Sequence, residues 1–185
     1  MQMTILWRAL PGVPEREARD AFVRRALGQA RFLRLAREPG GKPFLPPAAD
    51  DPRPPHLSLT HTRGLIACAL FDAPVGVDAE PADRQVAAAL ARRILSEPER
   101  ARYAALPAAA GGAFLLGRWV AREAHGKRTG EGIAGGGAHL VVTDDGRVLD
   151  AGGAVLSRVR TLSLAGCLVA VAGPDAPFTL LTEQI

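Results

Sequence analysis

The sequence is poor in cysteine, in aromatic residues and in long apolar runs, and each shortage narrows what the chain can be. Two of its 185 residues are cysteine and 5% are aromatic. Cys68 and Cys167 each lie in an apolar stretch, so we expect two small buried thiols in a reducing compartment, with a single disulfide as the alternative. No stretch approaches the length of a membrane span, and the first residues lack the basic and apolar regions of a signal peptide. We therefore expect a soluble cytoplasmic protein without a membrane partner.

The charge balance is basic. Lys and Arg number 23 against 19 Asp and Glu, which gives a net charge of +4. A basic surface favours acidic partners such as nucleic acids, phosphorylated small molecules or acidic proteins. The sequence has no long run of like charge and no aromatic residues interleaved with basic ones to stack on bases. We therefore expect a phosphate-bearing ligand and no nucleic acid.

Apolar residues make up 48% of the chain, enough for a core in one globular unit or in two small fused halves. Their pattern predicts the order strand, helix, strands twice, with a seam near Asp72–Pro74. The sequence therefore predicts an α+β fold of two halves, residues 1–73 and residues 74–185. In the first half the expected elements are a strand over Met3–Leu10, a helix over Pro14–Leu27, and strands over Leu57–Thr62 and Leu65–Phe71.

Local signals in the second half predict where its helices begin and end. The spacing of Ser96 and Glu99 is that of a capping box, so a helix should begin near Ser96. A break at Gly111–Gly112 precedes a longer helix over 113–128, which Gly130 is suited to cap. The other expected elements are a strand over Val75–Glu80 and two hairpins with turns at Asp144–Gly146 and Ala165–Gly166.

Acidic side chains on the strand and on the long helix suggest a metal site. Because strand side chains alternate, Asp78 and Glu80 lie on the same side. On the helix, Trp119, Glu123 and Lys127 share one face at four-residue steps. Three carboxylates make an oxygen-only site suited to a hard cation. The alternative for Glu123 and Lys127 is an ordinary surface ion pair, which contributes about 0.2–0.5 kcal/mol.

Four short motifs follow one another between residues 41 and 132. They are Gly41-Lys42-Pro43, Ser58-Leu59-Thr60-His61-Thr62, Val75-Gly76-Val77-Asp78-Ala79-Glu80, and the segment from Trp119 to Gly130. In this order they resemble the Gly-Lys-Pro, Ser-His-Ser, Gly-Val-Asp-Ile-Glu and Trp-x-x-Lys-Glu-Ala-x-x-Lys-x-x-Gly elements of the 4'-phosphopantetheinyl transferase superfamily. The match is to its single-chain, surfactin-synthetase-activating type.

The resemblance implies two similar halves related by a pseudo-twofold, with coenzyme A in the cleft between them. It also implies transfer of 4'-phosphopantetheine to a serine of an acidic apo carrier protein of a fatty-acid, polyketide or peptide synthetase. Attack on the pyrophosphate concentrates negative charge, so we expect Mg2+ held by Asp78, Glu80 and Glu123. By carry-over from the family, Glu123 accepts the serine proton, with a water as the alternative, and Lys127 stabilises the leaving 3',5'-ADP phosphate. We expect a monomer.

The resemblance also assigns Lys42, Thr60 and His61 to coenzyme A. His61 can donate to a phosphate and Thr60 adds a hydroxyl donor, whereas an isolated histidine would more often be structural. Lys42 can reach the nucleotide end of the cofactor, and a solvated turn lysine is an equally favoured interpretation.

The sequence departs from the family pattern at several positions: Thr60 and Thr62 replace serines and keep their hydroxyls, and Ala79 replaces a bulkier residue and should affect packing only. Arg122 replaces a lysine, which keeps the charge and changes its geometry. Gly126 costs about 1 kcal/mol relative to alanine and predicts a less rigid helix. Few residues precede Gly41, in the region that supplies the family's basic contacts to the 3'-phosphate. The candidates to replace those contacts are Arg24, Arg25 and Arg31.

Two other functions remain as alternatives. One is a non-catalytic module that binds coenzyme A or a carrier protein. The retained Asp78, Glu80, Glu123 and Lys127 argue against it, since a pure binder has less need of a metal site. The other is a Mg2+-dependent phosphohydrolase, which leaves the Lys42 and His61 motifs without a role.

Overall fold

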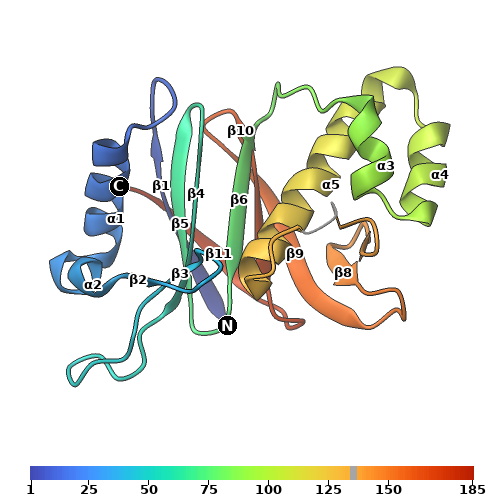
Figure 1. The fold of residues 1–185 in the computed structure, drawn as a ribbon. Helices are drawn as coiled ribbons and strands as arrows, with labels where there is room; N and C mark the ends of the chain where they lie inside the picture. Colours follow the sequence, from blue (N-terminus) through green and yellow to red (C-terminus); the bar gives the residue numbers. More distant parts are fainter. Residues whose placement is uncertain (134–136) are drawn as a thin grey trace.

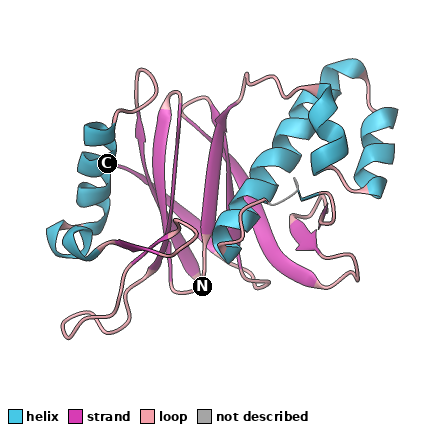
Figure 2. Ribbon diagram, viewed as in Figure 1, coloured by secondary structure: helices cyan, strands magenta, loops and turns pink. Residues whose placement is uncertain are grey.

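Two β-sheets face each other, and helices cover the outer side of each sheet (Figure 1). The computed structural model describes residues 1–133 and 137–185. Its mixture of helices and strands confirms the predicted α+β class (Figure 2). Within the described residues, no helix combines the length and the apolar character that a membrane span needs.

The first sheet has the strand order β11-β1-β5-β4 and is covered by the N-terminal helices. Its strands are β1 (Gln2–Ala9), β4 (His56–Thr62), β5 (Leu65–Phe71) and β11 (Thr179–Gln184). Helix α1 (Arg16–Leu27) packs on this sheet through Phe22, Val23 and Leu27. A short helix α2 (Gln29–Arg34) and the small hairpin of β2 (Ala36–Arg37) and β3 (Pro43–Phe44) follow α1.

The second sheet has the strand order β6-β10-β9-β8-β7. Its strands are β6 (Gly76–Pro81), β7 (Val141–Val142), β8 (Arg147–Leu149), β9 (Val155–Leu164) and β10 (Cys167–Gly173). The long helix α5 (Ala108–Thr129) packs on this sheet through Leu116, Val120, Ala121 and Ala124. The smaller helices η1 (Ala88–Leu90), α3 (Ala91–Ile94) and α4 (Glu97–Ala105) lie beside α5.

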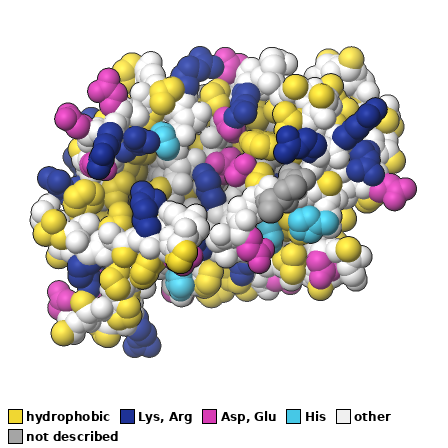
Figure 3. Space-filling view, viewed as in Figure 1, with side chains coloured by type: hydrophobic (Ala, Val, Ile, Leu, Met, Phe, Trp, Pro, Cys, Tyr) yellow, Lys and Arg dark blue, Asp and Glu magenta, His cyan; other side chains and the backbone are white. Residues whose placement is uncertain are grey.

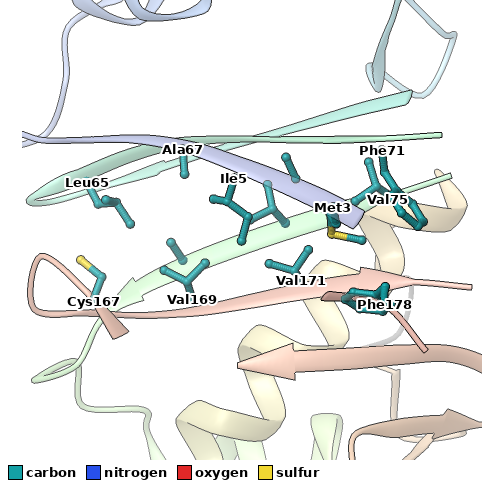
Figure 4. Close-up of a cluster of buried hydrophobic side chains, with 13 residues drawn as sticks. Met3, Ile5, Leu65, Ala67, Phe71, Val75, Cys167, Val169, Val171 and Phe178 are labelled. Carbon is teal, nitrogen blue, oxygen red and sulfur yellow. The ribbon is translucent and has the colours of Figure 1, made fainter. Parts of the chain in front are cut away.

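The space between the sheets is filled by apolar side chains from β1, β5, β6 and β10 (Figure 4). Val77 and Ala79 of β6 belong to this core. Since side chains alternate along a strand, Asp78 and Glu80 lie on the opposite face of β6, as predicted. Both cysteines are buried and free, so the expectation of two thiols is confirmed. Burial raises the pKa of the Cys68 thiol to about 12.

The two sheets meet along their edge strands β4 and β6. The backbone N–H of Val77 donates to the hydroxyl oxygen of Ser58 over 3.0 Å, and both residues are buried. A side-chain hydroxyl therefore takes the place of a ladder hydrogen bond at the seam. This contact brings the Thr60–His61 segment of β4 next to Asp78.

The expected boundary near residue 73 separates β5 from β6, which lie in different sheets. However, β11 pairs in parallel with β1, with Gln2 opposite Thr179. The last strand of the chain therefore completes the sheet that its first strand opens.

Most predicted elements are present with shifted bounds. The capping box at Ser96 and Glu99 is confirmed, and Gly130 ends α5 with a φ of 83°. In the turn between β9 and β10, Ala165 and Gly166 both have positive φ. The predicted break at Gly111–Gly112 is wrong, because α5 runs through both glycines.

Candidate functional site

Two adjoining cavities open where the two halves of the molecule meet. The first has a volume of about 570 Å3 and lies between α1, the 37–43 segment, β4 and the end of α5. The second, of about 800 Å3, lies over β4, β6 and the turn that follows β6. Leu59, Thr60, His61 and Lys127 line both cavities. These four residues therefore form the partition between two halves of one site.

The first cavity is basic. Its charged lining consists of Arg16, Arg19, Asp20, Arg37, Lys42 and Lys127. The sequence motifs pointed to Lys42 and Lys127, but the three arginines were missed. Their signal was present, since helical spacing places Arg16 and Arg19 on one face of α1. Near the centre of the molecular surface in Figure 3, basic and acidic side chains lie next to one another.

Two of the three arginines considered for the 3'-phosphate, Arg24 and Arg31, have other partners. Arg31 donates to both carboxylate oxygens of Asp51, at 2.8 Å and 3.1 Å. Arg24 stacks on the ring of Phe32 at 4.7 Å. Because Arg16 and Arg19 line the cavity, they are better placed than Arg24, Arg25 or Arg31 to meet an anion there.

Lys42 is half-buried and donates to the backbone carbonyl of Arg128 in the last turn of α5. That carbonyl is one of the four at a helix C-terminus that lack an intrahelical partner. Burial lowers the pKa of Lys42 from its ordinary value. The lysine therefore joins the first half to the end of α5 while its side chain also lines the basic cavity.

His61 is held by an arginine from α1. A nitrogen of the Arg19 guanidinium lies 2.9 Å from His61 Nε2. Since arginine can only donate, Nε2 accepts and the proton of the neutral ring is on Nδ1. Burial, with the charges of Arg19 and Lys127, lowers the pKa of His61. The ring is therefore neutral at pH 7 and offers one N–H donor.

Asp78 is the most buried charged residue that lines the second cavity, with 7% of the whole residue exposed. Its Oδ1 accepts a hydrogen bond from Lys127 Nζ at 2.7 Å, and the Thr60 hydroxyl lies 3.4 Å away. Its Oδ2 is buried without a hydrogen-bond partner among the described residues. Burial raises the pKa of Asp78, and the Lys127 charge opposes that shift.

Glu80 and Glu123 complete the acidic group. Glu80 pairs with Arg84, four residues along the chain. Burial raises the pKa of Glu123, the charge of Asp78 raises it further, and Lys127 lowers it. The charges of Asp78 and Lys127 therefore both act on the pKa of Glu123. The ion-pair partner of Lys127 is Asp78 and not Glu123.

The fit of a divalent cation can be judged from these side chains. Within residues 1–133 and 137–185, no three Asp, Glu, His or Cys side chains are placed to hold a metal ion together. The Oδ2 atom of Asp78 is nevertheless buried without a hydrogen-bond partner in the described structure, so a further donor or cation there would stabilise it. The donor set is all oxygen, as Mg2+ prefers. Asp78 and Glu80, which line one cavity, therefore fit such an ion as a pair, with its other ligands coming from elsewhere.

Close backbone packing brings α5 to this face of β6. A Cβ atom on Gly76 would overlap the carbonyl oxygen of Ala124 and the amide nitrogen of Arg128. Gly76 shares the face of β6 that carries Asp78 and Glu80. The glycine therefore lets the helix approach closely enough for Lys127 to reach Asp78.

Gly126 has a related role on the other side of the helix. A Cβ there would overlap the carbonyl of Gly132, because the chain beyond α5 folds back over the helix. The Gly132 N–H donates to the Gly126 carbonyl over 3.2 Å. The glycine is thus required by packing, and both residues line the basic cavity.

Arg122 does not point into the site. It is fully buried and pairs with Glu99, and it donates to the Leu140 carbonyl over 2.9 Å. Glu99 also receives Arg118 and forms the capping box of α4. The departure from lysine therefore serves an internal ion cluster that ties α4 to α5, one residue before Glu123.

The comparisons with known proteins agree with the motifs over the second half. Residues 74–149 match the family model described as 4'-phosphopantetheinyl transferase superfamily. A segment of 81 residues is 35% identical to 4'-phosphopantetheinyl transferase psf-1 of Bacillus pumilus. That match covers 44% of this chain and 34% of the relative, so the chain spans about a third of the relative's length. The matched model includes Asp78, Glu80, Glu123 and Lys127.

Proposed function

We propose, from the premise that residues 74–149 belong to the 4'-phosphopantetheinyl transferase superfamily, that this chain modifies carrier proteins. It would transfer 4'-phosphopantetheine from coenzyme A to a serine of an apo carrier protein and release 3',5'-ADP. The observation that carries the proposal is the pair of cavities, one basic and one that contains Asp78 and Glu80, that share Thr60, His61 and Lys127. A phosphorylated cofactor and a metal-bound reaction centre need such neighbouring environments.

In this proposal coenzyme A lies in the basic cavity. Arg16, Arg19 and Arg37 supply positive charge for its phosphates, and Lys42 lines the same wall. Since Arg19 holds Nε2 of His61, the ring's other nitrogen can donate to a phosphate oxygen. The cavity walls come from both halves, which supports the proposal that coenzyme A lies between them. We further propose that the two halves are similar and related by a pseudo-twofold.

Asp78 and Glu80, which line the adjoining cavity, would hold Mg2+ together with Glu123. The ion would neutralise charge on the pyrophosphate as the carrier serine attacks. Glu123 would accept the serine proton, with a water as the alternative acceptor. Burial raises the pKa of Glu123, which makes it a stronger base than an ordinary glutamate. Lys127 would compensate the charge that develops on the leaving phosphate.

The carrier would approach the second cavity from solvent. Arg63 and Arg84 line that cavity and are exposed, and an acidic carrier helix would compete with their present partners, Asp83 and Glu80. We further propose that the protein acts as a monomer in the cytoplasm, where coenzyme A and apo carrier proteins are both found.

The direct test is incubation with coenzyme A, Mg2+ and a panel of apo carrier proteins, followed by intact-mass measurement. The expected result is a gain of one phosphopantetheine on at least one carrier. Asp78→Ala should remove the gain. The matched control is Asp83→Ala, which removes an exposed carboxylate from the rim of the same cavity.

A folded wild-type protein that modifies no carrier in a broad panel would contradict the transferase. Calorimetric titration with coenzyme A would then decide whether the binding module is correct. Release of inorganic phosphate from small phosphate esters would instead favour the phosphohydrolase.

A further inference from the structure

Lys127 and Asp78 neutralise each other in this structure, although the proposed function gives each a different partner. Lys127 Nζ donates to Asp78 Oδ1 over 2.7 Å. Transfer chemistry would need Lys127 on a phosphate of coenzyme A and Asp78 on the metal. While the ion pair is intact, neither role is filled.

The position of Lys127 makes both roles accessible to one side chain. Lys127 lines both the basic cavity and the second cavity, which contains Asp78 and Glu80. Its side chain is about one-third exposed, whereas that of Asp78 is 9% exposed. A lysine side chain has four rotatable bonds, so it can move its ammonium group from one cavity to the other. Asp78 is buried on a strand and does not have this freedom.

We propose that Lys127 occupies the metal's place on Asp78 until a phosphate of coenzyme A draws it into the basic cavity. Coenzyme A binding would then free Asp78 for the metal, and metal binding would in turn favour the phosphate-bound position of Lys127. This inference rests on the proposed function and adds a coupling between its two ligands. By linkage each ligand must strengthen the binding of the other by the same factor.

Two neighbouring contacts support an exchange at Asp78. The Thr60 hydroxyl lies 3.4 Å from Oδ1, so the carboxylate stays oriented when the ammonium leaves. Oδ2 is buried without a partner in the described structure. The charge of this carboxylate is therefore compensated through Oδ1 by Lys127, and a departing lysine must be replaced by another cation. Glu80 pairs with Arg84 and Asp83 pairs with Arg63, so each carboxylate that lines the second cavity has a counter-ion.

The test measures metal binding without turnover. Mn2+ is the probe, because it accepts the same oxygen ligands as Mg2+ and is detected by paramagnetic resonance. Lys127→Gln should bind Mn2+ about tenfold more tightly than wild type in the absence of nucleotide. Adding 3',5'-ADP should strengthen Mn2+ binding clearly in wild type and much less in Lys127→Gln.

Controls separate this effect from a general change in charge. Arg92→Gln removes an exposed cation from α3 and should leave Mn2+ affinity unchanged. Adding Asp78→Asn to Lys127→Gln should abolish the gain. Equal Mn2+ affinity in wild type and Lys127→Gln would overturn the exchange. If carriers are still modified, the proposed function would survive that result. A tenfold gain without any carrier modification would support the exchange and reject the transferase.

A measurement on the wild-type protein covers the case in which Lys127→Gln does not fold. The ammonium nitrogen of Lys127 can be followed by NMR while 3',5'-ADP is added without metal. The exchange requires its signal to shift as the nucleotide saturates. A signal that stays in its Asp78-bound position at saturation would overturn the proposal.

Discussion

A methyl group on Gly76 would overlap the carbonyl oxygen of Ala124, so β6 and α5 touch backbone to backbone. Gly76→Ala must therefore push the helix away from the strand. Overpacking of this kind costs about 1–3 kcal/mol, and here the obstructing atoms are backbone that cannot rotate aside. We expect a loss of about 3 kcal/mol in the free energy of unfolding, measured with urea.

The matched control for Gly76 is Gly117→Ala in α5. No heavy atom lies within 4 Å of the Cβ position at Gly117. Alanine in a helix should then raise stability by up to about 1 kcal/mol. Unchanged stability of Gly76→Ala would mean that α5 does not pack on β6 as described.

Glu123→Gln separates catalysis from stability. If Glu123 accepts the serine proton, turnover should fall by about 10²–10⁴-fold with little change in melting temperature. Glu97→Gln makes the same chemical change at an exposed position of α4 and should keep wild-type turnover. Steady-state kinetics with a carrier protein provides the measurement, and wild-type turnover of Glu123→Gln would leave this residue with a structural role.

The Arg122–Glu99 pair is buried at both ends, with exposed fractions of 0% and 4%. Arg122→Met leaves part of the Glu99 charge uncompensated and should cost about 3–5 kcal/mol of stability. Arg122→Lys keeps the charge but loses the planar fork, so we expect a smaller loss. Adding Glu99→Gln to Arg122→Met should restore part of the stability. A double-mutant cycle in urea measures this coupling, and strictly additive losses would show that the two residues act independently.

Acidification should lower the free energy of unfolding through the protonation of His125. Its Nδ1 lies 2.7 Å from the Ser157 hydroxyl, and burial with the charge of Arg128 lowers its pKa. Between the two pKa values, His125 is therefore protonated in the unfolded chain and neutral in the folded protein. Stability should fall as the pH drops below 6.5, the ordinary value. The loss of stability ends once the pH falls below the lowered pKa of His125 in the folded protein.

Urea unfolding of wild type and His125→Gln across this pH range tests the assignment. The variant should show a shallower loss of stability on acidification. His56 and His61 also have pKa values lowered by burial, so part of the slope should remain. An identical slope in both proteins would assign the acid sensitivity to those other histidines.

The parts of the fold that could be predicted are those with local signals. Strands β4, β5 and β6 follow apolar patterns, and Ser96 and Gly130 carry their own capping chemistry. The prediction failed at Gly111–Gly112, where helix contacts outweigh the low helix propensity of glycine. Tyr103 packs against Gly111 there, and a Cβ would come within 3.1 Å of its ring.

The site was partly predictable for the same reason. Motif spacing placed Asp78 and Glu80 on one face and identified Lys127. It could not show that Lys127 would form its ion pair with Asp78. The roles of Arg19 beside His61 and of Arg122 beside Glu99 depend on contacts between segments far apart in sequence. Composition and periodicity carry no information about such pairs.

The parallel pairing of β1 with β11 has a consequence for how the molecule is made. Residues 2–7 lie opposite residues 179–184, so β1 waits for β11, which is synthesised about 170 residues later, before its sheet is complete. Such a long loop makes closure slow relative to hairpins such as β4–β5. During translation one edge of β1 would stay open to other chains on the ribosome. Deleting β11 should therefore impair folding yield in the cell more than its largely exposed side chains suggest.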